Sequence, residues 1–196
     1  MDVIDEKREL RARLRAARTA IPSEQIAMMS AAIVQCVRSS PAWARARAIA
    51  GFVGVNGEPD TRALLELAIA EGKALWLPRV LGARDLGFAQ VHGLAQLEPG
   101  GFGLLEPPSH AANVPLSAVA LDLVLVPGLA FTSDGARLGF GRGYYDRALA
   151  PFANDETPLR LGVCFTAFLD RELVPTDAHD VPMHAIATEH GIVVCA

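Results

Sequence analysis

The sequence predicts an α/β protein with a mostly parallel sheet and helices on both faces of that sheet. Short apolar runs alternate along the chain with segments whose apolar residues recur at helical spacing. The apolar runs are nearly continuous, which is typical of strands buried on both faces of a parallel sheet. The chain has 196 residues and no repeat, low-complexity tract or strong linker, so we expect one domain over residues 1–196.

Four helices are predicted from apolar spacing and from residues that start or stop helices. In the first, Leu10, Leu14 and Ala17 fall on one stripe. Pro22 and Ser23 then break the chain and are expected to cap the second helix. The predicted helices cover residues 5–20, a second segment that runs through Val37, a third that starts after Asp60 or Thr61 and stops at Gly72, and residues 144–149.

Six strands are predicted where short apolar runs end in turns. They cover residues 48–55, 74–77, 86–91, 121–126, 160–165 and 192–195. The fourth is expected to be central in the sheet, and Pro78 is expected to close the second. Residues 92–120 are rich in loops, and residues 127–143 are predicted to form one long glycine-rich loop.

The composition excludes several classes of protein. Apolar residues make up 51% of the chain and charged residues 20%, which rules out disorder as the main state. The net charge of −4 argues against nucleic-acid binding, since such domains are strongly basic. The three cysteines are widely spaced, and no apolar run approaches the ~20 residues of a membrane span. We therefore expect a cytoplasmic protein without membrane segments, as a monomer or weak homodimer.

The stretch VPGLAFTSDGARLGFGRGYYDR, residues 126–147, carries the strongest chemical signal. It follows an apolar strand and precedes a predicted helix, which is where ligands bind in open α/β sheets. Its closely spaced glycines let backbone amides approach an anion, and Arg137 and Arg142 add positive charge. The stretch therefore suits a polyphosphate, although it matches neither the Walker nor the dinucleotide-binding pattern. The alternative is a mobile glycine-rich surface turn.

Three further features are ambiguous by themselves. Asp146 is either a Mg²⁺ ligand beside phosphates or a partner of the helix dipole in a first turn. Lys7 and Arg11 are four residues apart and could grip one phosphate group, but most basic helix faces are only solvated. Glu58 remains unexplained in the turn NGEPDT, at another carboxyl end of a strand. The basic stripe on the first helix consists of Lys7, Arg11, Arg15 and Arg18.

The histidines and serines do not indicate a zinc site or a hydrolase. His179 and His184 are five residues apart without a HExxH pattern or a nearby cysteine, so hydrogen-bonded or solvated histidines are expected. Ser109 and His110 lack the sequence context of a nucleophile elbow.

The segment PGLAFTSDGARLGFGRGYYDR resembles the signature of the 5-formyltetrahydrofolate cyclo-ligase family, also called methenyltetrahydrofolate synthetases. Five further segments are similar to the family in the same order along the chain: KRELR, NGEPDT, WLPRV, GFGLLEP and LVPTDAHDVPMHAI. The likeness covers nearly the whole chain, and the glycine-rich segment with its YYD is the most specific part.

The resemblance implies a three-layer α/β/α sandwich of the sugar-isomerase and CoA-transferase type. It also implies ATP-dependent cyclisation of 5-formyltetrahydrofolate to 5,10-methenyltetrahydrofolate, with release of ADP and phosphate. ATP is then the co-substrate, Mg²⁺ the cofactor and the folate the small-molecule partner. Rival interpretations keep the fold but make the chain a phosphosugar isomerase or CoA-transferase relative, or a folate- or nucleotide-binding module without turnover.

The resemblance further implies roles for individual residues. Glu58 and Arg142 are the expected catalytic residues, and Asp146 and Asp180 are the expected metal ligands. The expected substrate-binding residues are Val53, Glu58, Phe140 and Tyr144. The expected ATP-binding residues are Lys7, Arg11, Arg137, Leu138, Gly139, Phe140, Gly141, Arg142, Gly143, Tyr144 and Tyr145.

Three positions depart from the family's pattern. Phe140 stands where some members carry a basic residue, so a charge contact is absent there or replaced by stacking. Thr132 and His184 stand where acidic residues are frequent. None of these departures removes a group that the implied reaction needs.

Overall fold

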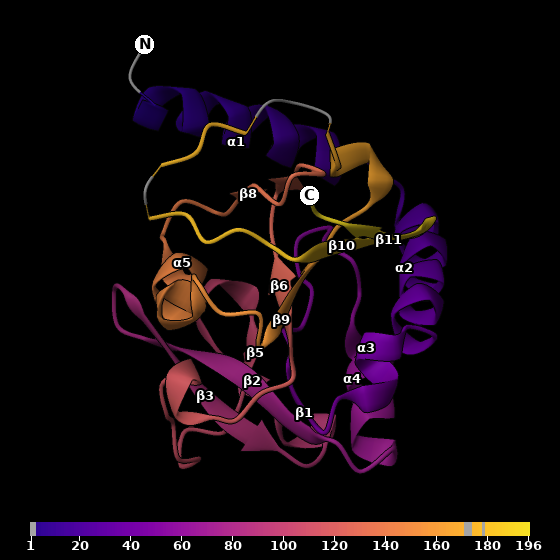
Figure 1. Ribbon diagram of the computed structural model, residues 1–196, viewed down its shortest axis with the longest axis vertical. Helices are drawn as coiled ribbons and strands as arrows, with labels where there is room; N and C mark the ends of the chain where they lie inside the picture. The colour runs from indigo at the N-terminus through magenta and orange to yellow at the C-terminus, as the bar shows by residue number, and fades with distance from the viewer. Residues whose placement is uncertain (1–2, 171–173, 178) are drawn as a thin grey trace.

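A seven-stranded sheet forms the centre of the computed structural model, which describes residues 3–170, 174–177 and 179–196 (Figure 1). Leu173 and Ala178 of the segment LVPTDAHDVPMHAI lie outside the described residues. The strands are, in spatial order, β11 (Gly191–Val194), β10 (Ala185–Thr188), β9 (Leu159–Val163), β6 (Leu123–Pro127), β1 (Ala48–Ala50), β2 (Ala74–Leu81) and β3 (Asp85–Val91). Neighbouring strands from β10 to β2 are parallel, and the edge strands β11 and β3 are antiparallel to their neighbours, so the expected mostly parallel sheet is confirmed.

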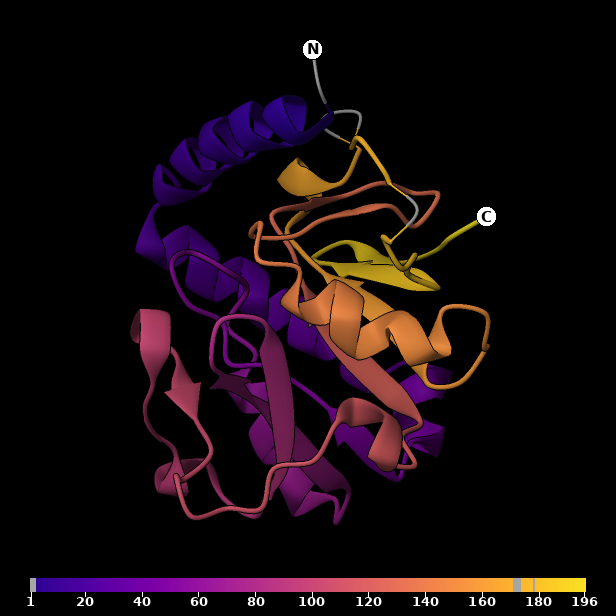
Figure 2. The ribbon, with the colours of Figure 1, turned by 90° about the vertical axis from the view of Figure 1, so that its left-hand side faces the viewer.

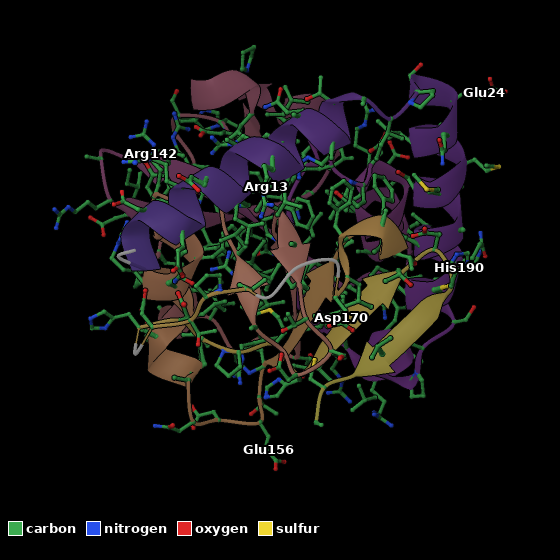
Figure 3. The ribbon with its side chains drawn as sticks, turned by 90° about the horizontal axis from the view of Figure 1, so that it is seen from above. Arg13, Glu24, Arg142, Glu156, Asp170 and His190 are labelled. Atoms are coloured by element: carbon green, nitrogen blue, oxygen red, sulfur yellow. The ribbon has the colours of Figure 1, made fainter. Side chains whose placement is uncertain are left out.

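Helices cover both faces of the sheet, as expected for three layers. The helices are α1 (Val3–Thr19), α2 (Ser23–Arg38), α3 (Pro41–Arg45), α4 (Arg62–Ala70) and α5 (Tyr144–Leu149). α2, α3 and α4 lie on one face, and the short α5 lies on the other with several single 3₁₀ turns (Figure 1; Figure 2). α1 crosses above the ends of the central strands (Figure 3). Among the described residues no single helix is long and apolar enough to cross a membrane, and α1 and α2 meet those limits only as a pair bent by 101°.

The apolar composition of the central strand, β6, reflects its position in the hydrophobic core. Every residue of β6 is buried, because β9 and β1 flank it and helices cover it. Leu10 and Leu14 of α1 and Val37 of α2 belong to the same core cluster. Burying one such leucine contributes roughly 1.5–3 kcal/mol to folding. The predicted apolar stripe of the first helix therefore faces the core.

The start of α4 is capped by a side chain, whereas the start of α2 is not. Asp60 Oδ1 accepts a hydrogen bond of 3.0 Å from the backbone N–H of Arg62 and so caps the helix. Thr61 occupies the cap position, but its hydroxyl donates to the carbonyl of Phe52 instead. Pro22 occupies the cap position of α2 without any side-chain hydrogen bond, so the chain break is confirmed but the expected side-chain cap is not formed.

The first two strands differ in length from the prediction. β1 ends at Ala50, and after a last hydrogen bond from Gly51 N–H to the carbonyl of Trp76 the chain leaves the sheet. β2 continues past Pro78 to Leu81, so the expectation that Pro78 closes this strand was wrong. Phe88, opposite Pro78 in β3, directs its N–H and C=O to Val114. The missing N–H of Pro78 therefore faces the side on which β1 has already ended.

Two short hairpins and one strand were not predicted. The expected long loop contains a hairpin of β7 (Ala130–Phe131) and β8 (Arg137–Leu138). The loop-rich region contains a second hairpin, of β4 (Glu98–Pro99) and β5 (Leu105–Glu106). β10 has only four residues and a single large apolar side chain, so nothing in its local sequence distinguishes it from a loop. Pairing with β9 and β11 makes it a fully buried strand.

The strand order places a switch point between β1 and β6. The chain leaves β1 for β2 on one side and later returns to β6 on the other side of β1. In open α/β sheets, ligands bind outside the carboxyl ends of the strands at such a point. α1 passes over this end of the sheet (Figure 3), so a ligand site is expected between this helix and the carboxyl ends of the strands.

Candidate functional site

Two cavities adjoin at the carboxyl edge of the sheet. Cavity 1 has a volume of about 600 Å³ and reaches the switch point through Phe52, Val53 and Pro127. Cavity 2 has a volume of about 800 Å³ and lies towards the start of α1. Residues shared by both linings form the wall between them, and these are Arg137, Gly139, Gly143 and Asp146.

The wall is built around residues 139–143, called the glycine loop below. Gly141 has φ +97° and Gly143 has φ +65°, both in a region that L side chains rarely adopt. A Cβ atom at Gly141 would also lie 3.3 Å from Nε of Arg11. Gly143 then occupies the cap position of α5, so the loop passes directly into the helix that carries the tyrosines and Asp146. The glycines are therefore needed for this path, and residues of the loop line both cavities.

The basic stripe of α1 holds this loop in place. Arg11 Nε donates to the carbonyl of Gly139 at 2.9 Å, and Arg15 Nη2 donates to the carbonyl of Phe140 at 2.9 Å. One turn further, the guanidinium of Arg18 lies 5.3 Å from the centroid of the Phe140 ring. Contacts between segments about 110–128 residues apart in sequence rule out a merely solvated helix face.

Two of the cations that line cavity 2 are paired with carboxylates. Lys7 is 6% exposed, and its Nζ lies 3.0 Å from Oδ2 of Asp177 and 2.7 Å from Oδ2 of Asp180. Burial alone would lower the pKa of Lys7, but hydrogen bonds and attraction from Asp180 and Asp177 raise it above its ordinary value. On the opposite wall, the buried guanidinium of Arg137 is ion-paired with Asp146. The expected ATP-binding residues that line this cavity are Lys7, Arg11, Arg137, Leu138, Gly139, Gly141 and Gly143.

Asp146 and Asp180, the expected metal ligands, both line cavity 2. Among the described residues, no group of three or more histidine, cysteine, aspartate or glutamate side chains could hold a metal ion. Mg²⁺ is commonly bound by one or two carboxylates together with substrate phosphates. The two carboxylates therefore fit a cation that arrives with a nucleotide, and they do not form a preassembled metal cage.

Cavity 1 has mainly apolar walls, and its lining includes two buried carboxyl groups, those of Glu58 and Glu106. Glu58 is 7% exposed, and its Oε2 accepts a hydrogen bond of 2.9 Å from the N–H of Val55. Its other oxygen, Oε1, lies 4.0 Å from Nη1 of Arg18 and has no hydrogen-bond partner. Burial raises the pKa of Glu58 to about 7, against the opposing effects of the Val55 N–H and Arg18. A carboxyl group poised near neutrality in a ligand-sized cavity is suited to exchange protons with a substrate.

The glycine loop and α5 divide their side chains between the two cavities. Four residues expected to bind ATP line cavity 1 rather than cavity 2, and these are Phe140, Arg142, Tyr144 and Tyr145. Val53, expected to bind substrate, also lines cavity 1. Tyr145 has a buried hydroxyl without a hydrogen-bond partner, and burial raises its pKa above the ordinary value. Arg142 is exposed and lies beside α1 at the edge of the molecule (Figure 3).

Several residues of the site were not among the sequence-derived candidates. Arg15 and Arg18 line cavity 1, and Asp177 binds Lys7. Leu105 and Glu106, from the β4–β5 hairpin, close another side of cavity 1. The spacing of Arg15 and Arg18 from Arg11 was a usable signal, because residues at i+4 and i+7 share a helix face. For the hairpin, the signal was the segment GFGLLEP, which resembles the family and contains both residues.

Comparison with known proteins supplies the family. A family model described as the 5-formyltetrahydrofolate cyclo-ligase family matches residues 3–189. The chain belongs to this family. The 5-formyltetrahydrofolate cyclo-ligase of Escherichia coli strain K12 is 31% identical over 178 residues, which cover 89% of this chain and 96% of the relative.

Solved structures show the same fold. The 5,10-methenyltetrahydrofolate synthetase of Aquifex aeolicus superposes with a TM-score of 0.81 at 31% identity, covering 96% of this chain and 92% of that one. The Mycoplasma pneumoniae enzyme of the same name has a TM-score of 0.72 at 20% identity, covering 96% and 99% of the two chains, and supports the fold alone. The expected fold and the expected enzyme class, a cyclo-ligase acting on a folate, are confirmed. The roles of individual residues stay predictions.

Proposed function

We propose that cavity 1 binds 5-formyltetrahydrofolate, that cavity 2 binds the phosphates of ATP, and that the chain joins the two in an ATP-dependent cyclisation. The observation that carries this proposal is the shared wall, in which one short loop borders both cavities. A phosphoryl group transferred between two substrates must lie within reach of both. Two adjoining cavities at the switch point of the sheet provide that arrangement.

The two linings suit the two ligands. Cavity 1 lies within the volume range of about 300–1,000 Å³ that is usual for small-molecule sites, and it has apolar walls with a few polar groups. A pterin and an aminobenzoyl ring need such walls. Cavity 2 brings together Lys7 and Arg11 from α1 and Arg137 from β8. Cations from separate elements can surround a triphosphate and neutralise charge that develops during transfer.

The proposed chemistry begins with activation of a poor leaving group. The formyl oxygen of the folate attacks the γ-phosphorus of ATP, and ADP leaves. The folate N10 then attacks the formyl carbon and closes the five-membered ring. The C–O bond to the transferred phosphate breaks, N10 loses its proton, and the products are 5,10-methenyltetrahydrofolate, ADP and phosphate. No side-chain nucleophile is needed, so alignment and charge neutralisation are the main tasks of the protein.

Glu58 is the proposed acceptor of the N10 proton. Its carboxyl group lines the folate cavity, and its unpartnered Oε1 is available to a ligand. With a pKa of about 7, Glu58 is substantially ionised at neutral pH and can take up a proton there. Arg142, in the glycine loop, is proposed to contact the phosphoryl group that is transferred. It lines cavity 1, the proposed folate cavity, so we expect it to lie near the transferred group rather than near the adenine.

Asp146 and Asp180 are the proposed ligands of Mg²⁺. When bound, the ion would neutralise phosphate charge. The carboxylates themselves keep Arg137 and Lys7 paired before the nucleotide arrives, so phosphates can replace carboxylates as partners of these cations. A cytoplasmic location and a monomer or weak homodimer stay predictions from the sequence.

The proposal is tested by mixing the purified protein with Mg-ATP and 5-formyltetrahydrofolate. We expect the near-ultraviolet absorbance of the methenyl product to appear, with one ADP and one phosphate released per product. Binding of ATP or folate without product would instead support a binding module. Turnover of a phosphosugar or an acyl-CoA without ATP consumption would support the rival enzyme classes on this fold.

A further inference from the structure

Four buried polar atoms of residues that line cavity 1 have no hydrogen-bond partner. They are Nε of Arg18, Nε of Arg137, Oε1 of Glu58 and the hydroxyl oxygen of Tyr145. The four residues come from α1, from β8, from the loop after β1 and from α5, and all of them line cavity 1. Leaving buried polar atoms unpaired is unfavourable, so such a cluster in one cavity indicates groups that pair with a ligand.

Arg18 is the member of this cluster to which the family resemblance assigns no role. It is 4% exposed, and its Nη1 donates to the carbonyl of Gly128 at 3.3 Å. The same nitrogen lies 4.0 Å from Oε1 of Glu58. Its guanidinium stacks at 5.3 Å from the centroid of the Phe140 ring. Arg18 therefore lies between the carboxyl group of Glu58 and the glycine loop.

The other arginines of the stripe behave differently. Arg11 and Arg15 use their donors on the carbonyls of Gly139 and Phe140, so they hold the loop backbone. The Nε–H of Arg18 is not used in this way. Arg18 thus combines a positive charge directed at Glu58 with a donor that remains available.

The surroundings of Glu58 make Arg18 its main charged neighbour. Glu58 is faced by Arg18 from α1 and by the uncharged Tyr145 from α5, and its own loop supplies the N–H of Val55. Within the described residues, Arg18 is the cation that forms an ion pair with Glu58. The other titratable residues that line cavity 1 are Arg15, Glu106, Arg137, Arg142, Tyr144 and Asp146.

We propose that Arg18 is a positioning residue of the reaction: its buried guanidinium favours the carboxylate form of Glu58 and offers its Nε–H to an oxygen of the bound folate. This proposal rests on the proposed function, because it requires a folate in cavity 1. The carboxylate receives the N10 proton, and the neighbouring guanidinium stabilises the charge that the carboxylate must carry beforehand.

The test compares Arg18→Gln and Arg18→Lys with the wild-type enzyme in pH profiles of kcat/KM for the folate. Without the positive charge, Arg18→Gln should move the acidic limb to higher pH and lower the rate at pH 6 about tenfold, with about threefold loss or less at pH 9. Arg18→Lys retains the charge and should keep the limb in place. It should nevertheless raise the folate KM about fivefold and leave the ATP KM within twofold, because lysine has no Nε–H at that position.

The control is Arg8→Gln, which removes an arginine of the same helix whose side chain is 73% exposed. It should leave both profiles unchanged. An acidic limb in Arg18→Gln that coincides with that of the wild type would overturn the proposal, as would an equal loss at every pH. If Arg18→Gln does not fold, an unchanged folate KM in Arg18→Lys overturns it.

Failure of the proposed function is recognised separately. It is shown by a wild-type protein that makes no methenyl product, whereas the role of Arg18 is measured as a ratio between variant and wild type. In that case the folate affinity of wild type and Arg18→Lys, measured by equilibrium titration, still tests the contact. Equal affinities would overturn it, and about fivefold weaker binding by the lysine variant would support it.

Discussion

The two cavities on either side of the glycine loop are prepared for their ligands in opposite ways. In cavity 2 the cations are paired with carboxylates, Lys7 with Asp177 and Asp180, and Arg137 with Asp146. In cavity 1 the inner end holds a carboxyl oxygen, a phenol hydroxyl and a guanidinium Nε–H that have no partners. Lys7 and Arg137 therefore have carboxylate partners before any ligand binds, whereas Glu58 and Tyr145 keep oxygen atoms without a hydrogen-bond partner.

This difference is instructive about how each ligand would gain affinity. In cavity 2 a triphosphate must compete with carboxylates for Lys7 and Arg137, so a cation that engages the released carboxylates would assist it. In cavity 1 a ligand can supply the missing hydrogen-bond partners of the buried polar atoms, and their unpaired burial is then no longer unfavourable. This favours a ligand whose polar groups match their positions. We therefore expect substitution of Glu58 to change the chemistry and the stability, and substitution of the charge pairs of cavity 2 to change the response to ATP and metal together with the stability.

The largest effect is expected for Glu58→Gln. Loss of the proton acceptor should lower kcat at least 100-fold, within the range of about 10²–10⁴ for general base catalysis. The pKa of Glu58 is raised from 4.5 to about 7, so the folded protein holds this proton more tightly than the unfolded chain does. The free energy of unfolding of the wild type should consequently decrease as the pH rises from about 4.5 to 7. In Glu58→Gln this decrease should be absent, because glutamine does not titrate.

Stability and activity together make the Glu58 test specific. At pH 8 the free energy of unfolding of Glu58→Gln should exceed that of the wild type by roughly 1–3 kcal/mol, measured by urea denaturation. Glu66→Gln, a change on the exposed side of α4, is the matched control and should alter neither property. Full activity in Glu58→Gln would contradict the assignment of cavity 1 as the reacting end.

The second effect is expected for Arg142→Ala. A contact with the transferred phosphoryl group that is lost from the transition state is worth about 1.4 kcal/mol or more, so turnover with ATP should fall at least tenfold. Initial rates at saturating folate measure this loss. Arg38→Ala, an exposed arginine in the last turn of α2, should have wild-type rates. Wild-type turnover in Arg142→Ala would remove this residue from the site.

A third effect concerns the charge pairs of cavity 2. Asp146→Asn should raise the Mg²⁺ concentration needed for half-maximal activity by about tenfold, because one proposed ligand loses its charge. It should also destabilise the protein, since the buried Arg137 then has no carboxylate partner. Glu156→Gln, at an exposed turn (Figure 3), is the control for general charge effects. A Mg²⁺ titration identical to that of the wild type would refute the ligand role.

The smallest effect is expected for Gly141→Ala in the loop that separates the cavities. At φ +97° a Cβ atom is strained by about 1–2 kcal/mol, and it would also press on Arg11 at 3.3 Å. The ATP KM should rise several-fold. Gly72→Ala provides a matched control, because Gly72 has φ +73° and nothing within 4 Å of the added atom. It should lose similar stability without any change in ATP KM, and an equal KM change in both variants would contradict a specific role for the loop.

The local sequence predicts a helix or strand well where the periodicity and composition of that segment are sufficient to specify it. The apolar stripe of α1, the buried run of β6 and the start of α5 at Tyr144 all follow from periodicity and composition. The prediction fails where a partner decides. β2 continues through Pro78 because the missing N–H faces the side on which β1 has already ended, and β10 becomes a strand only between two neighbours.

The same division holds for the site. Glycine spacing and nearby arginines mark the loop as a place for an anion, and the spacing of Lys7 and Arg11 places both on one helix face. The sequence alone thus determined which segments carry chemistry. Only the tertiary structure decided that α1 holds the glycine loop, that this loop separates two cavities, and that Arg18 faces Glu58. Side-chain periodicity reports which face of an element is buried, whereas contacts between distant segments depend on how whole elements pack, and no local pattern encodes that packing.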